Sequence, residues 1–201
     1  MSILKNYLSL QFSGFENLLL LDKQKIKKSI YKSILWILIT FSIACLSKFE
    51  LNYLPVTYLR NAAIETIGPH FWNIVVLAGL FLIGLTFLYP KFNFFQESAH
   101  STLAGAHISG LIALGSLISE LTFSFPSLFP IFETWRIILI FLALVASILL
   151  IYGLVYSTYY LSQLLISKEI IDRINKLDFR LRFIGFLFFS IMPLVFFLLE
   201  K

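Results

Sequence analysis

Apolar residues fill four stretches of the sequence almost without interruption, and a fifth stretch is only slightly less apolar. The four are Ser33–Cys45, Phe71–Tyr89, Ile137–Val155 and Phe183–Leu199, and the fifth is Ser101–Ser119. A helix on the surface of a soluble domain keeps a polar face toward water, which these stretches lack. A helix that crosses a bilayer needs about 20 predominantly apolar residues. The pattern predicts an all-α, multi-pass transmembrane helical bundle with five spans, or four if the fifth stretch does not cross.

Two segments outside these stretches predict amphipathic helices. In residues 1–32, a capping box of Ser13 and Glu16 starts a helix over Gly14–Lys32. Its leucines followed by lysines suit either a helix at the headgroup level or a helix that leads into the first span. The fourth predicted helix, Trp135–Ser167, is longer than a bilayer requires. Its extension, about residues 156–182, has isoleucines on one face and i,i+4 ion pairs on the other, and either binds a soluble partner or packs against the N-terminal helix.

Composition supports the membrane class independently. Hydrophobic residues make up 59% of the chain and charged residues 13%, against about 25% charged residues in soluble domains. The 201 residues therefore divide into a cytoplasmic N-terminal segment, 1–32, and a transmembrane domain, 33–201, without a separate soluble catalytic domain. The single cysteine, Cys45, lies inside the first apolar stretch, where we expect a small buried hydrophobe.

The basic residues predict the orientation of the chain. With five spans, twelve of the 16 lysines and arginines fall on the side of the N-terminus and four on the other side. With four spans the division is nine to seven. Because basic loops stay in the cytoplasm, the five-span arrangement with the N-terminus in the cytoplasm is favoured. The net charge of +5 is thus explained by basic residues that set the orientation of the chain in the membrane, and it predicts no direct binding of nucleic acid.

The two predicted outer loops differ in character. Lys48–His70 contains a short helical pattern that Gly68 and Pro69 should end. Glu120–Trp135 holds four phenylalanines and two prolines. Aromatic residues at such positions typically form an interfacial belt, and the alternative is contact with an external ligand or partner.

Residues that could carry chemistry are few. The sequence has no protease, zinc-binding or phosphate-binding motif, so we expect no enzyme and no cofactor. Glu97, His100 and His107 lie on roughly one face of the third predicted span. An ionisable residue inside a membrane is a functional candidate, which makes His107 the intramembrane polar candidate for a proton or metal role. The alternative is that a hydrogen bond to a neighbouring serine satisfies a structural His107.

The third span also predicts close helix packing. Gly105, Ser109 and Ala113 recur at intervals of four residues, and Ala106 with Gly110 repeats the spacing. Small residues at this spacing let helix backbones approach closely in lipid. The facing helix belongs either to the same chain or to a second copy, as in a homo-oligomer.

The size and layout of the whole chain resemble those of the membrane subunits of Kiwa anti-phage defence systems. The shared features are about 200 residues, basic cytoplasmic segments, Phe-rich outer loops and no enzyme motif. The resemblance implies an oligomeric inner-membrane sensor that holds a cytosolic DNA-binding effector at the membrane. Because it includes no motif, it assigns no functional residue. The chain is also similar in layout to five-span Yip-type proteins.

These observations lead to one expected function and two alternatives. We expect a non-enzymatic, oligomeric membrane scaffold or sensor that contacts lipids and recruits a cytosolic protein. Its partner-binding residues would be Arg173, Lys176 and Arg180, on the charged face of the fourth helix's extension. The first alternative is a small transporter or channel subunit that uses His107 and the small-residue span, and the second is a membrane enzyme.

Overall fold

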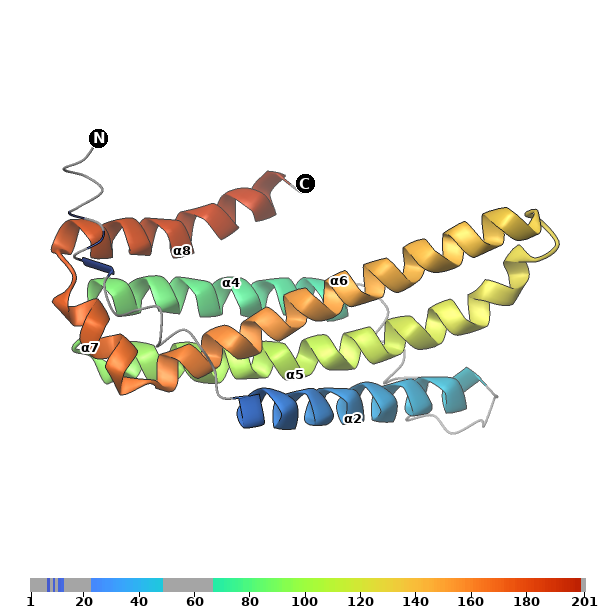
Figure 1. The fold of residues 1–201 in the computed structure, drawn as a ribbon, viewed down its shortest axis with the longest axis horizontal. Coiled ribbons are helices and arrows are strands. Elements are labelled where there is room, and N and C mark those ends of the chain that lie inside the picture. The colour runs from blue at the N-terminus through green and yellow to red at the C-terminus, as the bar shows by residue number, and fades with distance from the viewer. Residues whose placement is uncertain (1–6, 8, 10, 13–22, 49–66, 200–201) are drawn as a thin grey trace. The chain divides into compact units, whose positions relative to one another are not determined.

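The structure is a computed structural model that describes residues 7, 9, 11, 12, 23–48 and 67–199. These residues form helices and no strand (Figure 1). In chain order the helices are α2 (Lys23–Lys48), α4 (Ile67–Leu88), α5 (Asn93–Ser124), the short 3-10 helix η1 (Phe125–Leu128), α6 (Thr134–Ile166), α7 (Lys168–Lys176) and α8 (Phe179–Leu199). The predicted all-α class is confirmed for this part of the chain.

Among the described residues, four helices are long and apolar enough to cross a membrane, judged by length and composition. They are α2, α4, α5 and α6. The weakest predicted span, Ser101–Ser119, belongs to α5 and is therefore one of the four. The last apolar stretch forms α8, a helix of 21 residues with Pro193 inside it.

Several helices extend beyond their predicted ends. α2 runs without a break from Lys23 through the predicted boundary at residues 32 and 33 to Lys48. α5 includes most of the predicted loop 90–100 and continues past Glu120. Gly68 and Pro69, which were predicted to end a short helix, lie in the first turn of α4, and the residues before Ile67 that would form that helix lie outside the described residues. Proline fits there, since backbone N–H groups in a first turn have no partner within the helix. The capping box at Ser13 and Glu16 and most of the loop 48–70 lie outside the described residues.

The predicted extension of the fourth helix is a separate helix. α6 ends at Ile166, and Ser167 has an extended backbone with φ −71° and ψ 109°. α7 then ends at Lys176, and the next residue, Leu177, is also extended at φ −65° and ψ 147°. Asp178 precedes α8, and its carbonyl accepts the N–H of Arg182. Two breaks thus replace the continuous helix that the sequence pattern allowed.

The chain forms two compact units, described here separately. The first unit comprises Met1–Ile26, Ile74–Gly105 and Tyr159–Lys201, and the second comprises Lys27–Asn73 and Ala106–Thr158. The core of the first unit contains Ile83, Ala99, Leu103 and Leu165. In the same unit α4 and α8 meet closely, because a Cβ added to Gly185 would lie 2.6 Å from Cδ1 of Phe87. The ring of Phe87 stacks on that of Phe189 at 5.6 Å.

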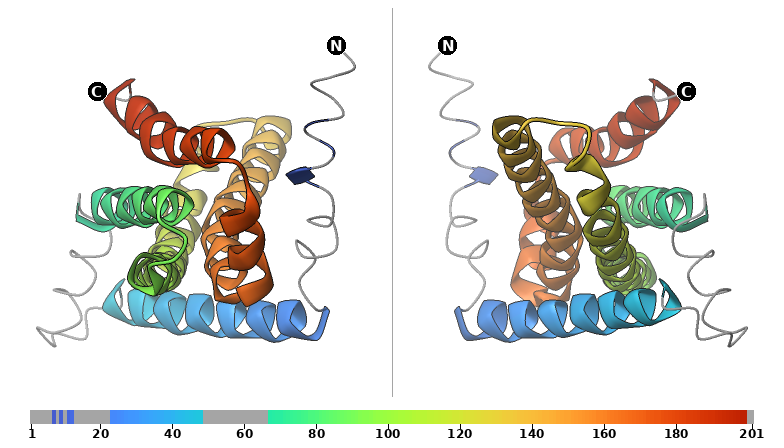
Figure 2. Two further views of the ribbon diagram at one scale, coloured as in Figure 1. Left: turned by 90° about the vertical axis from the view of Figure 1, so that its left-hand side faces the viewer. Right: turned by 90° about the vertical axis from the view of Figure 1, so that its right-hand side faces the viewer.

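The second unit is held together by small and polar residues. In this unit α5 turns through η1 into α6, so the two helices run in opposite directions (Figure 2). α2 buries a stripe that includes Ser29, Ser33 and Ala44, while its large apolar side chains, such as Leu35, are exposed. A Cβ added to Gly115 of α5 would lie 2.7 Å from the carbonyl oxygen of Ile37 in α2. This face of α2 therefore packs on α5 and leaves the larger apolar residues to lipid.

Candidate functional site

The short helix α7 is fixed to the first unit by one apolar face. Ile170, Ile171 and Ile174 are buried in a cluster with Phe87 of α4 and Leu164 of α6. At 3.6 residues per turn these three positions lie within an arc of about 100°, so they occupy a single face of α7. The opposite face of α7 must therefore point away from the unit.

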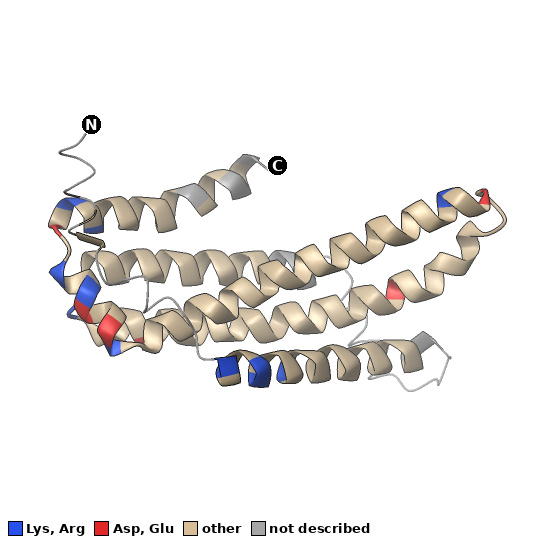
Figure 3. Ribbon diagram, in the orientation of Figure 1, with Lys and Arg blue, Asp and Glu red and all other residues tan. Residues whose placement is uncertain are grey.

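That opposite face carries two of the three predicted partner-binding cations. Arg173 and Lys176 are exposed in the last turn of α7, and Arg180 is exposed in the first turn of α8. Figure 3 shows basic residues interleaved with acidic ones along α7 and at the start of α8. Cations are favourable near a helix C-terminus, where the helix dipole is negative, so Arg173 and Lys176 also suit the end of α7. We call Arg173, Lys176 and Arg180 the basic corner.

The junction between α7 and α8 also contacts the N-terminal segment. The hydroxyl of Tyr7 donates a hydrogen bond to Oδ2 of Asp178 at 2.8 Å, and the backbone N–H of Asp178 donates to Oε1 of Gln11 at 3.4 Å. The hydrogen bond from Tyr7 lowers the pKa of Asp178, and the backbone N–H groups of Arg180 and Phe179 act in the same direction. The same hydrogen bond raises the pKa of Tyr7.

These contacts bear on the two interpretations of the extension. The sequence allowed it to bind a partner or to pack against the N-terminal helix. The N-terminal segment contacts Asp178, whereas the side chains of Lys176 and Arg180 on either side of it are exposed. The junction therefore combines an internal contact with an exposed charged surface.

His107 lies at a contact of three helices in the second unit. Its Nε2 is 3.3 Å from Oγ of Ser33 in α2, and its Nδ1 is 3.1 Å from the carbonyl oxygen of Val155 in α6. A carbonyl can only accept, so Nδ1 carries the proton, and in the neutral ring Nε2 accepts from the serine hydroxyl. The ring also meets that of Tyr156 edge-on at 6.2 Å. This is the serine hydrogen bond expected for a structural histidine.

The other two residues of the predicted polar face, His100 and Glu97, lie in different surroundings from His107. His100 is half-buried in the first unit, and its Nδ1 lies 3.0 Å from the carbonyl oxygen of Ser162. Glu97 is exposed, so it does not share the buried face. Gln96 lies beside His100 instead, and its Nε2 donates to the carbonyl oxygen of Leu165 at 2.6 Å. That carbonyl is in the last turn of α6, where it has no partner within the helix, and Gln96 thus caps α6.

The predicted small-residue face divides into different environments. Gly110 is buried, and an added Cβ would lie 2.7 Å from Nε1 of Trp72 and 2.8 Å from Cγ2 of Val155. Gly105 is exposed, with nothing within 4 Å of an added Cβ. The Ser109 hydroxyl donates to the carbonyl of Ala106 in its own helix. Gly110 therefore packs within the chain, whereas Gly105 leaves room for another helix.

Sequence reasoning missed the closest helix contacts. Gly115, Gly84 and Gly185 bring helices together, yet none of them belongs to the spaced pattern that drew attention to α5. The available signal was partial, because a lone glycine inside a span marks a position without a side chain and does not identify its partner.

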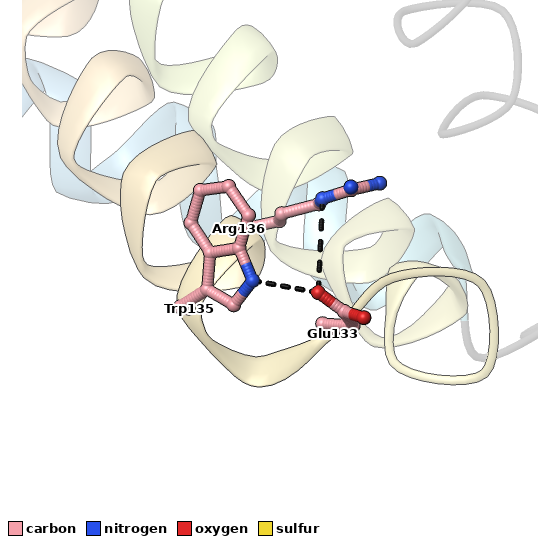
Figure 4. A network of polar contacts seen from close by, with 3 residues as sticks. All are labelled: Glu133, Trp135 and Arg136. Carbon is pink, nitrogen blue, oxygen red and sulfur yellow. Dashed lines mark hydrogen bonds and ion pairs between the residues drawn. The ribbon is translucent and has the colours of Figure 1, made fainter.

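A polar group marks the start of α6. The indole N–H of Trp135 donates to Oε2 of Glu133 at 2.6 Å, and Nε of Arg136 lies 3.9 Å from the same oxygen (Figure 4). The Arg136 guanidinium also lies over the Trp135 ring at 5.2 Å. All three side chains are exposed. An exposed tryptophan held by charged neighbours is typical of an interfacial anchor, the first of the two interpretations of this loop.

Within the described ranges, no three His, Cys, Asp or Glu side chains are grouped so as to hold a metal ion. Comparison with known proteins finds no protein family, no curated protein and no solved structure that the chain matches. The functional proposal must therefore come from the residues themselves.

Proposed function

We propose that the protein is a non-enzymatic, oligomeric scaffold or sensor of the bacterial inner membrane that recruits a cytosolic protein at the basic corner. In this proposal α8 is the fifth span and the N-terminus is cytoplasmic. The support is the twelve-to-four division of basic residues that five spans produce. Anti-phage defence is the setting that the resemblance to Kiwa membrane subunits implies.

One observation carries the proposal. The basic corner is exposed, while the opposite face of α7 is buried through Ile170, Ile171 and Ile174. Because this short helix is already fixed in place, a partner can bind its charged surface at little cost in conformational entropy. Complementary charges mainly raise the rate of association, so an acidic surface on the partner is the chemistry that fits.

The position of His107 favours this proposal over a transporter that uses this residue. Its two ring nitrogens already face Ser33 and the carbonyl oxygen of Val155. Two grooves among the described residues of the second unit have mostly apolar linings. A polar path for ions has no support from these residues.

Oligomerisation remains a part of the proposal with its own candidate residue. Gly105 is the small residue of the predicted face that is exposed, with open space around it. A second copy could approach α5 closely there, as small residues in spans allow. Gly110 cannot serve in this way, because Trp72 and Val155 already occupy its surroundings.

The test is loss of partner capture after neutralisation of the basic corner. Arg173→Gln, Lys176→Gln and Arg180→Gln are combined, and a partner identified by co-purification is then bound to purified protein over a range of salt concentrations. We expect slower association and a weaker salt dependence, with normal membrane insertion.

Two controls make the test specific. The matched control replaces Lys25, Lys27 and Lys28, three exposed cations of α2 on the same predicted side, with Gln. It should retain capture, and so should His107→Ala. If the basic-corner variant keeps both its partner and its biological activity while His107→Ala abolishes activity, the scaffold proposal is wrong.

A further inference from the structure

A groove of about 400 Å³ lies in the second unit between α4, α5 and α6. This volume is within the range of about 300–1,000 Å³ that is typical of ligand pockets. Leucine, isoleucine, valine and alanine side chains supply most of the lining, and Asn73 and Glu120 are polar residues among them. The groove is therefore suited to an apolar ligand with one polar end.

One end of the groove is closed by tight packing. At Gly110 the three helices are so close that an added Cβ would lie 2.7 Å from Nε1 of Trp72 and 2.8 Å from Cγ2 of Val155. The Trp72 indole is fixed, because its N–H donates to the carbonyl of Ala106 at 2.9 Å. Ala113, one turn further along α5, has a small side chain and lines the open part of the groove.

The groove opens onto surface that faces hydrocarbon. Leu117 and Leu154 line it and are also 37% and 53% exposed, so they form part of its opening. α5 and α6 are long and apolar enough to cross a membrane, and α6 exposes the large apolar side chains of Leu149 and Leu150 next to Ile151 of the lining, so we expect the opening to face lipid chains. An apolar groove that opens to hydrocarbon is filled by what surrounds it, because leaving it empty loses dispersion contacts.

The length of the groove matches one lipid chain. Glu120 lies ten residues beyond Gly110 on α5, which corresponds to about 15 Å along the helix. A hydrocarbon core of about 30 Å has leaflets of about the same 15 Å, the depth that one acyl chain spans.

We propose that this groove binds one acyl chain of a membrane phospholipid. The chain lies along α5 and α6, with its methyl end toward Gly110 and Trp72 and its ester and headgroup end toward Glu120. This inference goes beyond recruitment of a cytosolic protein and does not depend on it, since it requires only that this part of α5 and α6 lies in a bilayer.

The first experiment fills the groove. Ala113→Phe places a ring where the lipid chain would lie, and Ala146→Phe adds the same ring to an exposed position of α6 that lines neither described groove. After exchange into mild detergent, native mass measurements should show one retained phospholipid per chain for the wild type and Ala146→Phe, and its loss for Ala113→Phe. Equal retention by both variants, no retention by the wild type, or a bound free fatty acid would overturn the proposal.

A second experiment detects an acyl chain in the groove of the folded protein by fluorescence quenching. With Trp36 and Trp135 replaced by Phe, Trp72 becomes the only indole, and it lines the groove. In vesicles of phosphatidylcholine with dibrominated acyl chains, its emission should be strongly quenched. Adding Ala113→Phe should remove most of that quenching, whereas Ala146→Phe should leave it unchanged. Quenching that is absent at the outset, or unaffected by Ala113→Phe, would show that no chain occupies the groove.

Discussion

Replacing Gly115 by alanine tests the contact between α2 and α5 most directly. The added Cβ would lie 2.7 Å from the carbonyl oxygen of Ile37 and closer still to Oγ1 of Thr40. The hydroxyl can rotate, but the carbonyl belongs to the backbone of α2 and can only move with the helix. Since close C···O contacts in proteins occur at about 3.3–3.6 Å, α2 must move away by roughly 0.6–0.9 Å.

The expected change in the free energy of unfolding is the difference between two opposing effects. Overpacking in a well-packed interior costs typically about 1–3 kcal/mol. Alanine regains roughly 0.5–1 kcal/mol relative to glycine in a helix. Gly115→Ala should therefore lower the free energy of unfolding by about 1–2 kcal/mol, because the contact cost is the larger of the two. For a chain of this size, that corresponds to a fall in Tm of roughly 2–8 °C.

The assay compares this substitution with a matched one in α6. Gly153→Ala adds the same methyl group where nothing lies within 4 Å, and it should leave Tm unchanged or raise it slightly. Thermal unfolding of both variants in the same detergent cancels the effect of the micelle. If Gly115→Ala is as stable as Gly153→Ala, then α2 does not pack on α5 at this position and the description of the second unit is wrong.

Two further predictions concern topology and pH. In intact cells, an impermeant thiol reagent should label cysteine at Ser127 and not at Lys25 or Lys176, because the five-span arrangement puts most basic residues inside; labelling at Lys176 would exclude that arrangement. The Tyr7–Asp178 hydrogen bond should be fully present above pH 3.8, the ordinary pKa of an aspartate side chain, and it should be lost as the pH falls through the lowered pKa of Asp178. At high pH it should also be lost, as the pH rises through the raised pKa of Tyr7. Carbon NMR of the Asp178 carboxyl should show its pKa rising toward 3.8 in Tyr7→Phe, and an unchanged value would exclude the contact.

The sequence predicted where helices lie better than it predicted how they pack. The length of the fourth helix was expected as Trp135–Ser167, and α6 covers Thr134–Ile166. Such lengths follow from runs of apolar residues, which a single sequence displays directly. The break at Leu177 was not evident, because the apolar spacing of Ile170, Ile174, Leu177 and Leu181 continues across it and only the backbone shows the extended conformation.

Contacts between helices depend on pairs of residues that are distant in the sequence. His107 could be identified as a buried polar residue, but Ser33 lies 74 positions away and Val155 lies 48 positions away. Gly105 and Gly110 look alike in the sequence, yet one is open and the other lies against Trp72. No periodicity distinguishes them, since both lie in the same helix and only the arrangement of its neighbours differs.

The distribution of buried residues explains why apolarity was a poor guide to packing here. Ser33, Thr158 and Ser162 are among the most buried residues, whereas Leu149 and Leu150 are 64% and 65% exposed. Lipid solvates leucine as well as another helix does, so apolar area gives helices little reason to associate. Small residues and hydrogen bonds to carbonyls must supply that reason. Polar residues then determine how the spans pack. Under the proposed function, a cytosolic protein would recognise what the spans leave outside the bilayer, and on the described residues of α7 and α8 that would be the exposed charge around Asp178.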